Sequence, residues 1–126
     1  MTNTHTAPKF TAEAWAAFWA APDPSHIGGL LAEGIVGHWP GDPKPARGRA
    51  DYLAKIAGVV EALPDLRLQL VDSATVAGDT DGEELIFLHY TGTAADGAVT
   101  IRGMDRVRTR DGIVVENVIR YDLSEL

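Results

Sequence analysis

Hydrophobic and polar residues alternate through the last quarter of the chain, a pattern typical of β-strands with one buried face. Between Val99 and Asp122, two β-rich runs flank Arg110-Asp111-Gly112, which is typical of a hairpin with a three-residue loop. Such a loop would pair Thr109 with Ile113. A two-residue turn at Asp111-Gly112 would shift the pairing by one residue.

The three-residue register predicts which side chains of this hairpin line the interior. The opposite face carries arginines and Glu116, so we expect the apolar face to be buried. Asp105 is then a single carboxylate on an apolar surface, opposite Asn117, whereas the two-residue turn would place it opposite Val118. Burying an ionised carboxylate is costly and usually shifts its pKa. The predicted interior face consists of Ile101, Gly103, Asp105, Val107, Val115, Asn117, Ile119 and Tyr121.

The first half of the chain shows helical spacing. Thr11 can cap a helix whose apolar residues recur every three or four positions. Asp23-Pro24 is typical of the start of a short helix that we expect to reach about Ala32. A brief strand over residues 35–39 and a stiff loop over residues 40–45 follow. The clearest helix runs from Arg49 to Leu63, with an apolar stripe of Tyr52, Leu53, Ile56, Val59, Val60 and Leu63.

From Leu66 the hydrophobic period changes to two. Strands are predicted over residues 66–77 and 84–93, followed by the hairpin. Segregated helices and strands favour an α+β fold, with three helices laid across one face of a curved antiparallel sheet. We expect one domain over residues 10–126 and a flexible tail over residues 1–9.

Composition and charge narrow the classes of partner. The 126 residues carry a formal net charge of −7 and contain no cysteine. Acidic surfaces repel phosphate backbones and anionic lipid, so nucleic acid and membrane partners are disfavoured. No apolar run approaches the roughly 20 residues that span a bilayer, and no secretory signal is evident, so we expect a cytoplasmic location. The histidines are scattered without metal-ligand spacing, so no metal site is predicted.

A second predicted hairpin, at Ala95-Asp96-Gly97, suggests a catalytic pair. A three-residue loop there pairs Ala94 with Ala98, which places His89 diagonally beside Asp105 and Phe87 directly opposite it. A His and an Asp in an apolar cavity form a plausible acid–base pair. Gly103 would leave space between them for a ligand. A two-residue turn would instead turn His89 outward and Tyr90 inward.

Further candidates for substrate contacts come from other elements. Trp15 and Trp19 lie on one helix and can form a lid, although aromatic stripes of this kind usually pack as core side chains. His38 and Trp39 end the short strand, and only one of the two can point into a cavity. The predicted substrate-binding set is Trp15, Trp19, His38, Trp39, Phe87, Asn117 and Tyr121.

These motifs together resemble a known family. An aromatic N-terminal helix, His38-Trp39-Pro40-Gly41, Leu63-Pro64-Asp65 and the Gly103–Glu116 hairpin are similar to SnoaL-like proteins, the polyketide-cyclase-related branch of the nuclear-transport-factor-2-like superfamily. The resemblance implies a cone-shaped bent sheet whose helices enclose a pocket, and often a homodimer. It also implies that Asp105 matches the acid–base aspartate of an aldol ring closure. The cyclases' Gly-Thr-His reads Gly92-Thr93-Ala94 here.

The resulting functional expectation is a homodimeric enzyme that needs no cofactor. Asp105 and His89 would move protons next to a carbonyl of a largely apolar, polyketide- or terpenoid-like substrate. The reaction would be of cyclase, isomerase or lyase type. Two alternatives stay open. The protein can be a non-catalytic small-molecule binding or dimerisation module, or an enzyme in which Asp105 activates a water molecule that adds to an epoxide.

Overall fold

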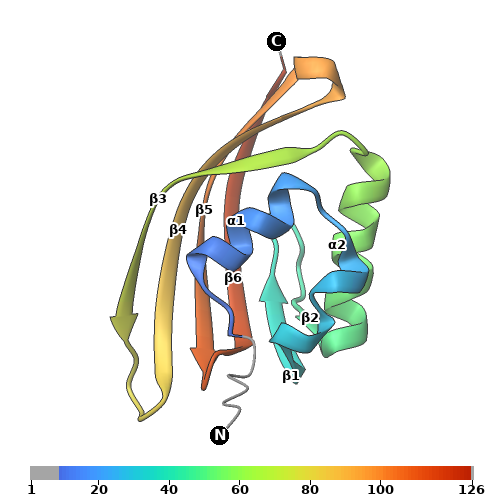
Figure 1. Ribbon diagram of the computed structural model, residues 1–126. Helices are drawn as coiled ribbons and strands as arrows, with labels where there is room; N and C mark the ends of the chain where they lie inside the picture. Colours follow the sequence, from blue (N-terminus) through green and yellow to red (C-terminus); the bar gives the residue numbers. More distant parts are fainter. Residues whose placement is uncertain (1–8, 126) are drawn as a thin grey trace, which may run out of the picture.

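A curved sheet forms one wall of the protein (Figure 1). The computed structural model describes the backbone of residues 9–125 and the side chains of residues 9–122. Within this part the sheet has six strands in the order β2-β1-β6-β5-β4-β3. Their bounds are Leu31–His38 (β1), Ala46–Arg47 (β2), Arg67–Ala77 (β3), Glu83–Ala94 (β4), Val99–Arg110 (β5) and Ile113–Glu125 (β6).

The sheet is mixed rather than purely antiparallel. β1 runs parallel to β6, while the other neighbouring strands are antiparallel. β1 also begins at Leu31, earlier than predicted, and the short strand β2 lies just after the expected loop. The predicted α+β class is confirmed with this correction. The predicted flexible tail falls, except for Lys9, outside the described residues.

Two α-helices are present in the described part, α1 (Ala12–Ala20) and α2 (Arg49–Ala62). The Thr11 side chain caps α1 by accepting a hydrogen bond of 3.0 Å from the backbone N–H of Ala14. The short helix predicted from Asp23-Pro24 to about Ala32 is wrong, because this segment forms two single 3₁₀ turns, Pro24–His26 and Gly28–Leu30. The paired glycines have low helix propensity. None of the described helices is long and apolar enough to span a bilayer.

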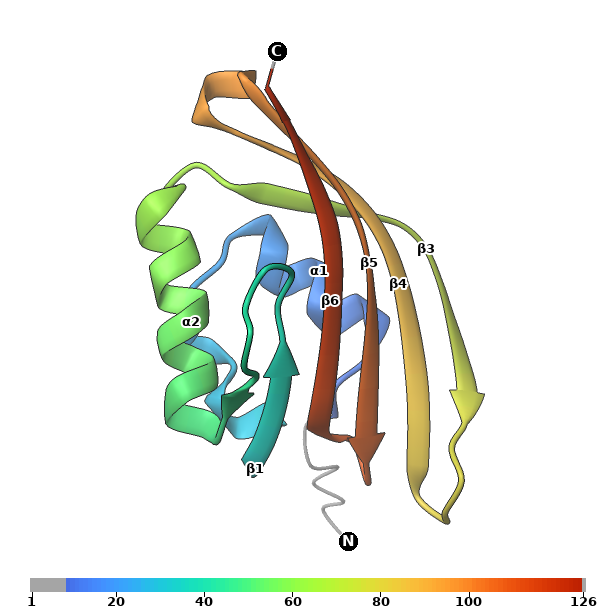
Figure 2. The ribbon, with the colours of Figure 1, turned by 180° about the vertical axis from the view of Figure 1, so that it is seen from behind.

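The two helices lie on the concave side of the sheet. Figures 1 and 2 show α1 across the hollow of β3–β6 and α2 beside β1. The hydrophobic core lies between the helices and the sheet. Its completely enclosed side chains come from β1, β4, β5 and β6, and include Ile35, Ile86, Leu88, Val107 and Val114.

The β5–β6 hairpin has a two-residue turn followed by a bulge. Arg110 pairs with Ile113, and both turn residues, Asp111 and Gly112, have positive φ angles of 53° and 84°. The predicted three-residue loop is therefore wrong. The register then shifts by one residue, because Thr109 pairs with Val114 but Arg108 pairs with Glu116.

The bulge decides which β6 side chains face inward. It places Asp105 opposite Ile119, rather than opposite Asn117 or Val118 as the two predicted registers had it. Beyond the bulge, Asn117 and Ile119 are buried as predicted. Before the bulge, Val114 is buried in place of Val115. One extra residue therefore restores the predicted alternation along most of the strand.

The β4–β5 connection is one residue longer than predicted. Ala94 pairs with Val99 instead of Ala98, with residues 95–98 forming the loop. Because side chains alternate along a strand, this shift exchanges the two faces of β4. Tyr90 lies opposite Gly103 on the inner face, and His89 lies on the outer face.

Gly103 is required by the ring of Tyr90. A Cβ atom at this position would lie 2.5 Å from the Cζ and Oη atoms of Tyr90. We expect Gly103→Ala to lower the free energy of unfolding by about 1–3 kcal/mol through this overpacking. Chemical denaturation measures the change.

Gly58→Ala is the matched control. Gly58 is exposed on α2, and nothing lies within 4 Å of a Cβ placed there. This variant should gain about 0.5–1 kcal/mol, because alanine has the higher helix propensity. Equal stability of the two variants would contradict the proposed packing of Tyr90 on Gly103.

Candidate active site

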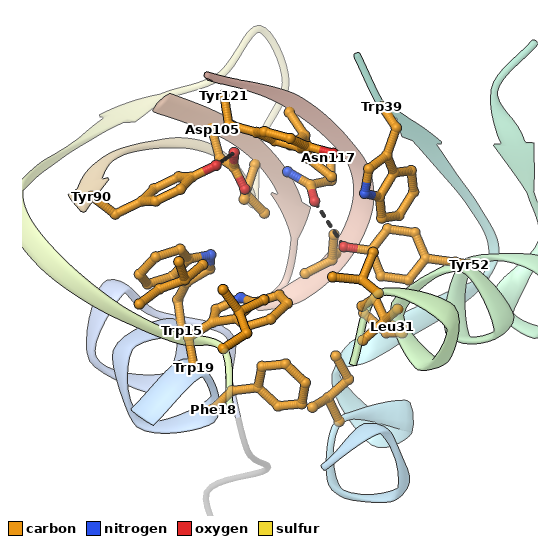
Figure 3. Close-up of a pocket in the computed structure, with 18 of the residues that line it drawn as sticks. Trp15, Phe18, Trp19, Leu31, Trp39, Tyr52, Tyr90, Asp105, Asn117 and Tyr121 are labelled. Atoms are coloured by element: carbon orange, nitrogen blue, oxygen red, sulfur yellow. Dashed lines mark hydrogen bonds between the residues drawn. The ribbon is translucent and has the colours of Figure 1, made fainter. Parts of the chain in front are cut away.

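A cavity of about 210 Å³ lies between the inner face of the sheet and the two helices (Figure 3). Its walls are apolar, apart from Asp105, Asn117, the tyrosine hydroxyls and the indole N–H groups. No Lys, Arg or His side chain of the described residues lines it. The aromatic part of the wall consists of Phe10, Trp15, Phe18, Trp19, Trp39, Tyr52, Tyr90 and Tyr121.

The carboxyl group of Asp105 is the main polar feature of the cavity. Asp105 lies on β5 between the inward-facing Gly103 and Val107, and only 7% of it is exposed. The hydroxyl of Tyr90 donates a hydrogen bond of 2.9 Å to its Oδ1 atom. The polar side-chain groups of Asn117 and Trp15 also lie near the carboxyl. The predicted interior position of Asp105 is confirmed.

Burial changes the proton affinity of this carboxyl. Loss of solvent raises the pKa of Asp105 to about 7, although the hydrogen bond from Tyr90 and the nearby polar groups of Asn117 and Trp15 act to lower it. A carboxyl with a pKa near neutrality exists in both protonation states under ordinary conditions. It can therefore act as a general base and as a general acid.

A second buried hydrogen bond connects helix α2 to strand β6 beside Asp105. The hydroxyl of Tyr52, on α2, donates to the Oδ1 atom of Asn117 at 2.7 Å. This bond occupies the amide oxygen of Asn117, and the NH₂ group of Asn117 donates to the backbone carbonyl of Arg106 at 3.4 Å. Burial and the nearby charge of Asp105 raise the pKa values of Tyr52 and Tyr90 well above the ordinary value, so both hydroxyls stay protonated donors.

Most of the predicted substrate-binding residues line the cavity. Trp15 and Trp19 reach it from α1, Trp39 from the end of β1, and Asn117 and Tyr121 from β6. Figure 3 shows these side chains around the same hollow. Their predicted placement is confirmed, whereas their contacts with a substrate stay a prediction.

Three predicted site residues lie elsewhere. His89 is on the outer face, with its side chain 43% exposed and its Nδ1 atom 3.3 Å from Asp72, so the predicted pair with Asp105 is wrong. Phe87 pairs with Arg106 and is 37% exposed. His38 contacts Glu116 at 3.3 Å outside the cavity, and Trp39 is the one that turns inward. The one-residue register shift explains the errors at His89 and Phe87.

The structure adds two residues that sequence reasoning missed. Tyr90 and Tyr52 supply the hydroxyl groups that organise Asp105 and Asn117. Tyr52 was predicted only as part of an apolar helix stripe, and Tyr90 faced inward only in the alternative register. The available signal in the sequence was a glycine that can pair with an aromatic residue of the next strand, here Gly103 with Tyr90, since an aromatic ring often packs over such a glycine. Gly103 is covered by Tyr90 and does not leave the predicted open space.

Metal-binding clusters are absent from the described part of the chain. No three His, Cys, Asp or Glu side chains there come close enough together to hold an ion.

The chain belongs to the SnoaL-like domain family, whose family model matches residues 12–117. Solved structures of similar fold include proteins described as nuclear-transport-factor-2-like. A candidate polyketide cyclase from Xanthomonas campestris pv. campestris is 19% identical, with a TM-score of 0.64 over 87% of this chain and 86% of that chain. A search of curated proteins found no match.

Two further solved structures show the same fold. A protein from Kribbella flavida DSM 17836 is 20% identical, with a TM-score of 0.69 over 93% of this chain and 88% of that chain. A protein of ketosteroid isomerase-like fold from Catenulispora acidiphila DSM 44928, in complex with trimethylamine, is also 20% identical. Its TM-score is 0.67 over 90% of this chain and 85% of that chain.

The pKa of Asp105 predicts how stability depends on pH. In the folded state this pKa is about 7, against about 3.9 in an unfolded chain. Between these values the folded state binds more protons, so stability falls as pH rises above about 4 and levels off above about 7. Between pH 5 and pH 8 we expect a loss of about 2–3 kcal/mol from this group.

Asp105→Asn removes this dependence, because the amide does not titrate. The difference in unfolding free energy between the variant and the wild type should grow in favour of the variant from pH 5 to pH 8. Urea denaturation at both pH values measures it. A constant difference would show that the carboxyl ionises as readily in the folded protein as in the unfolded chain.

The hydroxyl of Tyr90 should hold the Asp105 pKa down. Tyr90→Phe keeps the ring but removes the donor, so the pKa of Asp105 should rise further. A ¹³C NMR titration of the carboxyl carbon measures this shift. Tyr121→Phe is the control, because Tyr121 lines the cavity but is not among the groups that shift this pKa. Equal shifts in both variants would contradict a specific role for Tyr90.

Proposed function

We propose that this protein is a cofactor-independent acid–base enzyme that moves a proton next to the carbonyl group of a small, largely apolar molecule. The observation that supports the proposal most directly is the buried Asp105 carboxyl in an aromatic cavity, hydrogen-bonded by Tyr90 at 2.9 Å. Acid–base enzymes often tune a carboxyl toward neutral pH by burial in this way.

The reaction begins with the ionised carboxylate. Asp105 takes the proton from the carbon next to the substrate carbonyl, and the electron pair of the C–H bond moves to form an enolate. In an isomerisation, the protonated carboxyl then returns its proton to another carbon of the conjugated enolate. In an aldol cyclisation, the enolate carbon first forms a bond to a second carbonyl carbon of the same molecule, the electron pair of that C=O π bond moves to its oxygen, and the carboxyl gives its proton to the resulting alkoxide. Either sequence leaves the enzyme unchanged and needs no other reactant.

Neutral hydrogen-bond donors beside Asp105 can stabilise the enolate intermediate. Tyr90 donates to the carboxyl, and the N–H groups of Asn117 and Trp15 lie near it. When Asp105 accepts the proton, it loses its charge and holds these donors less strongly. The donors are then available to the enolate oxygen, where hydrogen bonds in a dry site are most effective.

The size of the cavity limits the substrate. A cavity of about 150 Å³ can hold benzene, whereas pockets for drug-sized ligands begin at about 300 Å³. At about 210 Å³ this cavity suits a molecule of one or two rings. A terpenoid-like or short polyketide-like carbonyl compound meets this limit, in agreement with the cyclase and isomerase names among the structural neighbours.

Exchange of α-protons tests the chemistry without knowledge of the natural substrate. In D₂O, the wild-type protein should accelerate deuterium incorporation next to the carbonyl of 2-cyclohexen-1-one or 1-tetralone, followed by ¹H NMR. Asp105→Asn should lose about 100-fold or more of this acceleration, the usual share of general base catalysis. The variant's melting temperature should not fall, because a buried charge is removed.

Glu84→Gln is the control, since it removes an exposed carboxylate outside the cavity. It should exchange as the wild type does. Binding of the ketones without exchange would instead support a binding module. Opening of styrene oxide with solvent ¹⁸O in the product would support addition of water.

A further inference from the structure

The cavity has an unusual balance of charge. One carboxyl group and many aromatic rings line it, but no basic side chain of the described residues does. The polar groups next to Asp105, those of Tyr90, Asn117 and Trp15, are all neutral. The ionised form of Asp105 therefore has no counter-charge within the cavity.

The aromatic rings add to the negative potential. The face of an aromatic ring carries partial negative charge and attracts cations placed within about 6 Å. Trp15 packs against Tyr90 with ring centroids 4.9 Å apart, and Trp39 packs against Tyr52 at 5.1 Å. In Figure 3 these pairs stand on opposite sides of the hollow, with Trp19 and Phe18 below.

We propose that this cavity is also a binding site for small lipophilic ammonium ions, with Asp105 as the counter-ion and the surrounding rings as an aromatic cage. A cation supplies the charge that the carboxylate lacks, and its methyl groups fill an apolar space of about 210 Å³. The net charge of −7 attracts cations to the protein and repels anions. Anionic ligands are excluded, because they would face Asp105 with no basic side chain to pair with.

This inference goes beyond the proposed function. It requires Asp105 to lie in the cavity but does not require catalysis. A bound ammonium ion keeps Asp105 ionised and occupies the space of a carbonyl substrate. Such ions are therefore expected to inhibit the proton transfer proposed above.

Choline and 3,3-dimethylbutan-1-ol provide a matched pair of probes. They have the same shape and hydroxyl group, but only choline is charged. All three tryptophans of the chain line the cavity, so tryptophan fluorescence reports occupancy directly. At pH 8 we expect choline to bind at least about tenfold more tightly than the alcohol, a difference in the range of desolvated cation–π pairing.

The preference should depend on pH. The other titratable groups facing Asp105 are Tyr90 from β4, Tyr52 from α2 and Tyr121 from β6, and no Lys, Arg or His lines the cavity with them. Choline pairs with the ionised carboxyl, whose pKa is about 7, so its affinity should fall severalfold or more from pH 8 to pH 5. The affinity of the alcohol should not fall with it.

Two variants complete the test. Asp105→Asn should abolish the preference for choline while keeping the affinity for the alcohol, which also shows that the variant is folded. Glu84→Gln changes the net charge equally but should keep the preference. The proposal is overturned if choline and the alcohol bind equally at pH 8, if neither binds, or if Asp105→Asn retains the preference. Ketone exchange without choline binding would overturn this inference alone, and choline binding without exchange would overturn the proposed enzyme alone.

Discussion

The hydrogen bond between Tyr90 and Asp105 depends on the packing of the whole sheet. It requires β4 and β5 to pair in one register, with Gly103 beneath the tyrosine ring. It also requires the helices to close over the concave face, because only then is the carboxyl removed from water. A buried acid of this kind lowers stability near neutral pH, and the aromatic packing around it offsets that cost.

Carboxyl groups on the two faces of the sheet have different neighbours. On the outer face, Arg106 and Arg108 contact Glu116 at 3.1 and 3.4 Å, and Arg108 contacts Glu83 at 2.9 Å. The arginines lower the pKa of Glu116, so this carboxylate stays ionised. On the inner face, Asp105 meets only neutral donors. Carboxyl groups are thus ion-paired on one face, whereas on the other the single carboxyl has a raised pKa and only neutral neighbours.

Rigid support distinguishes this cavity from a simple gap in the core. The Tyr52 hydroxyl reaches Asn117 from α2. Gly37 has no side chain and so leaves room for the rings of Tyr52 and Trp39. Trp15 is fixed between Tyr90 and Trp19. Donors held in this way need little reorganisation when charge develops on a ligand, which is the physical basis of electrostatic catalysis and of selective binding alike.

The sequence by itself determined the α+β class, the amphipathic helices and the interior position of Asp105, because the side-chain period of a strand is independent of its partner. It did not determine the strand registers. The loop after Ala94 is one residue longer than predicted, so Tyr90 rather than His89 faces inward. The bulge near Val115 makes Ile119 the cross-strand partner of Asp105. The contact of Tyr52 with Asn117 spans 65 positions along the chain. Loop length, bulges and long-range contacts are settled by the packing of the complete chain, and only the tertiary structure decides them.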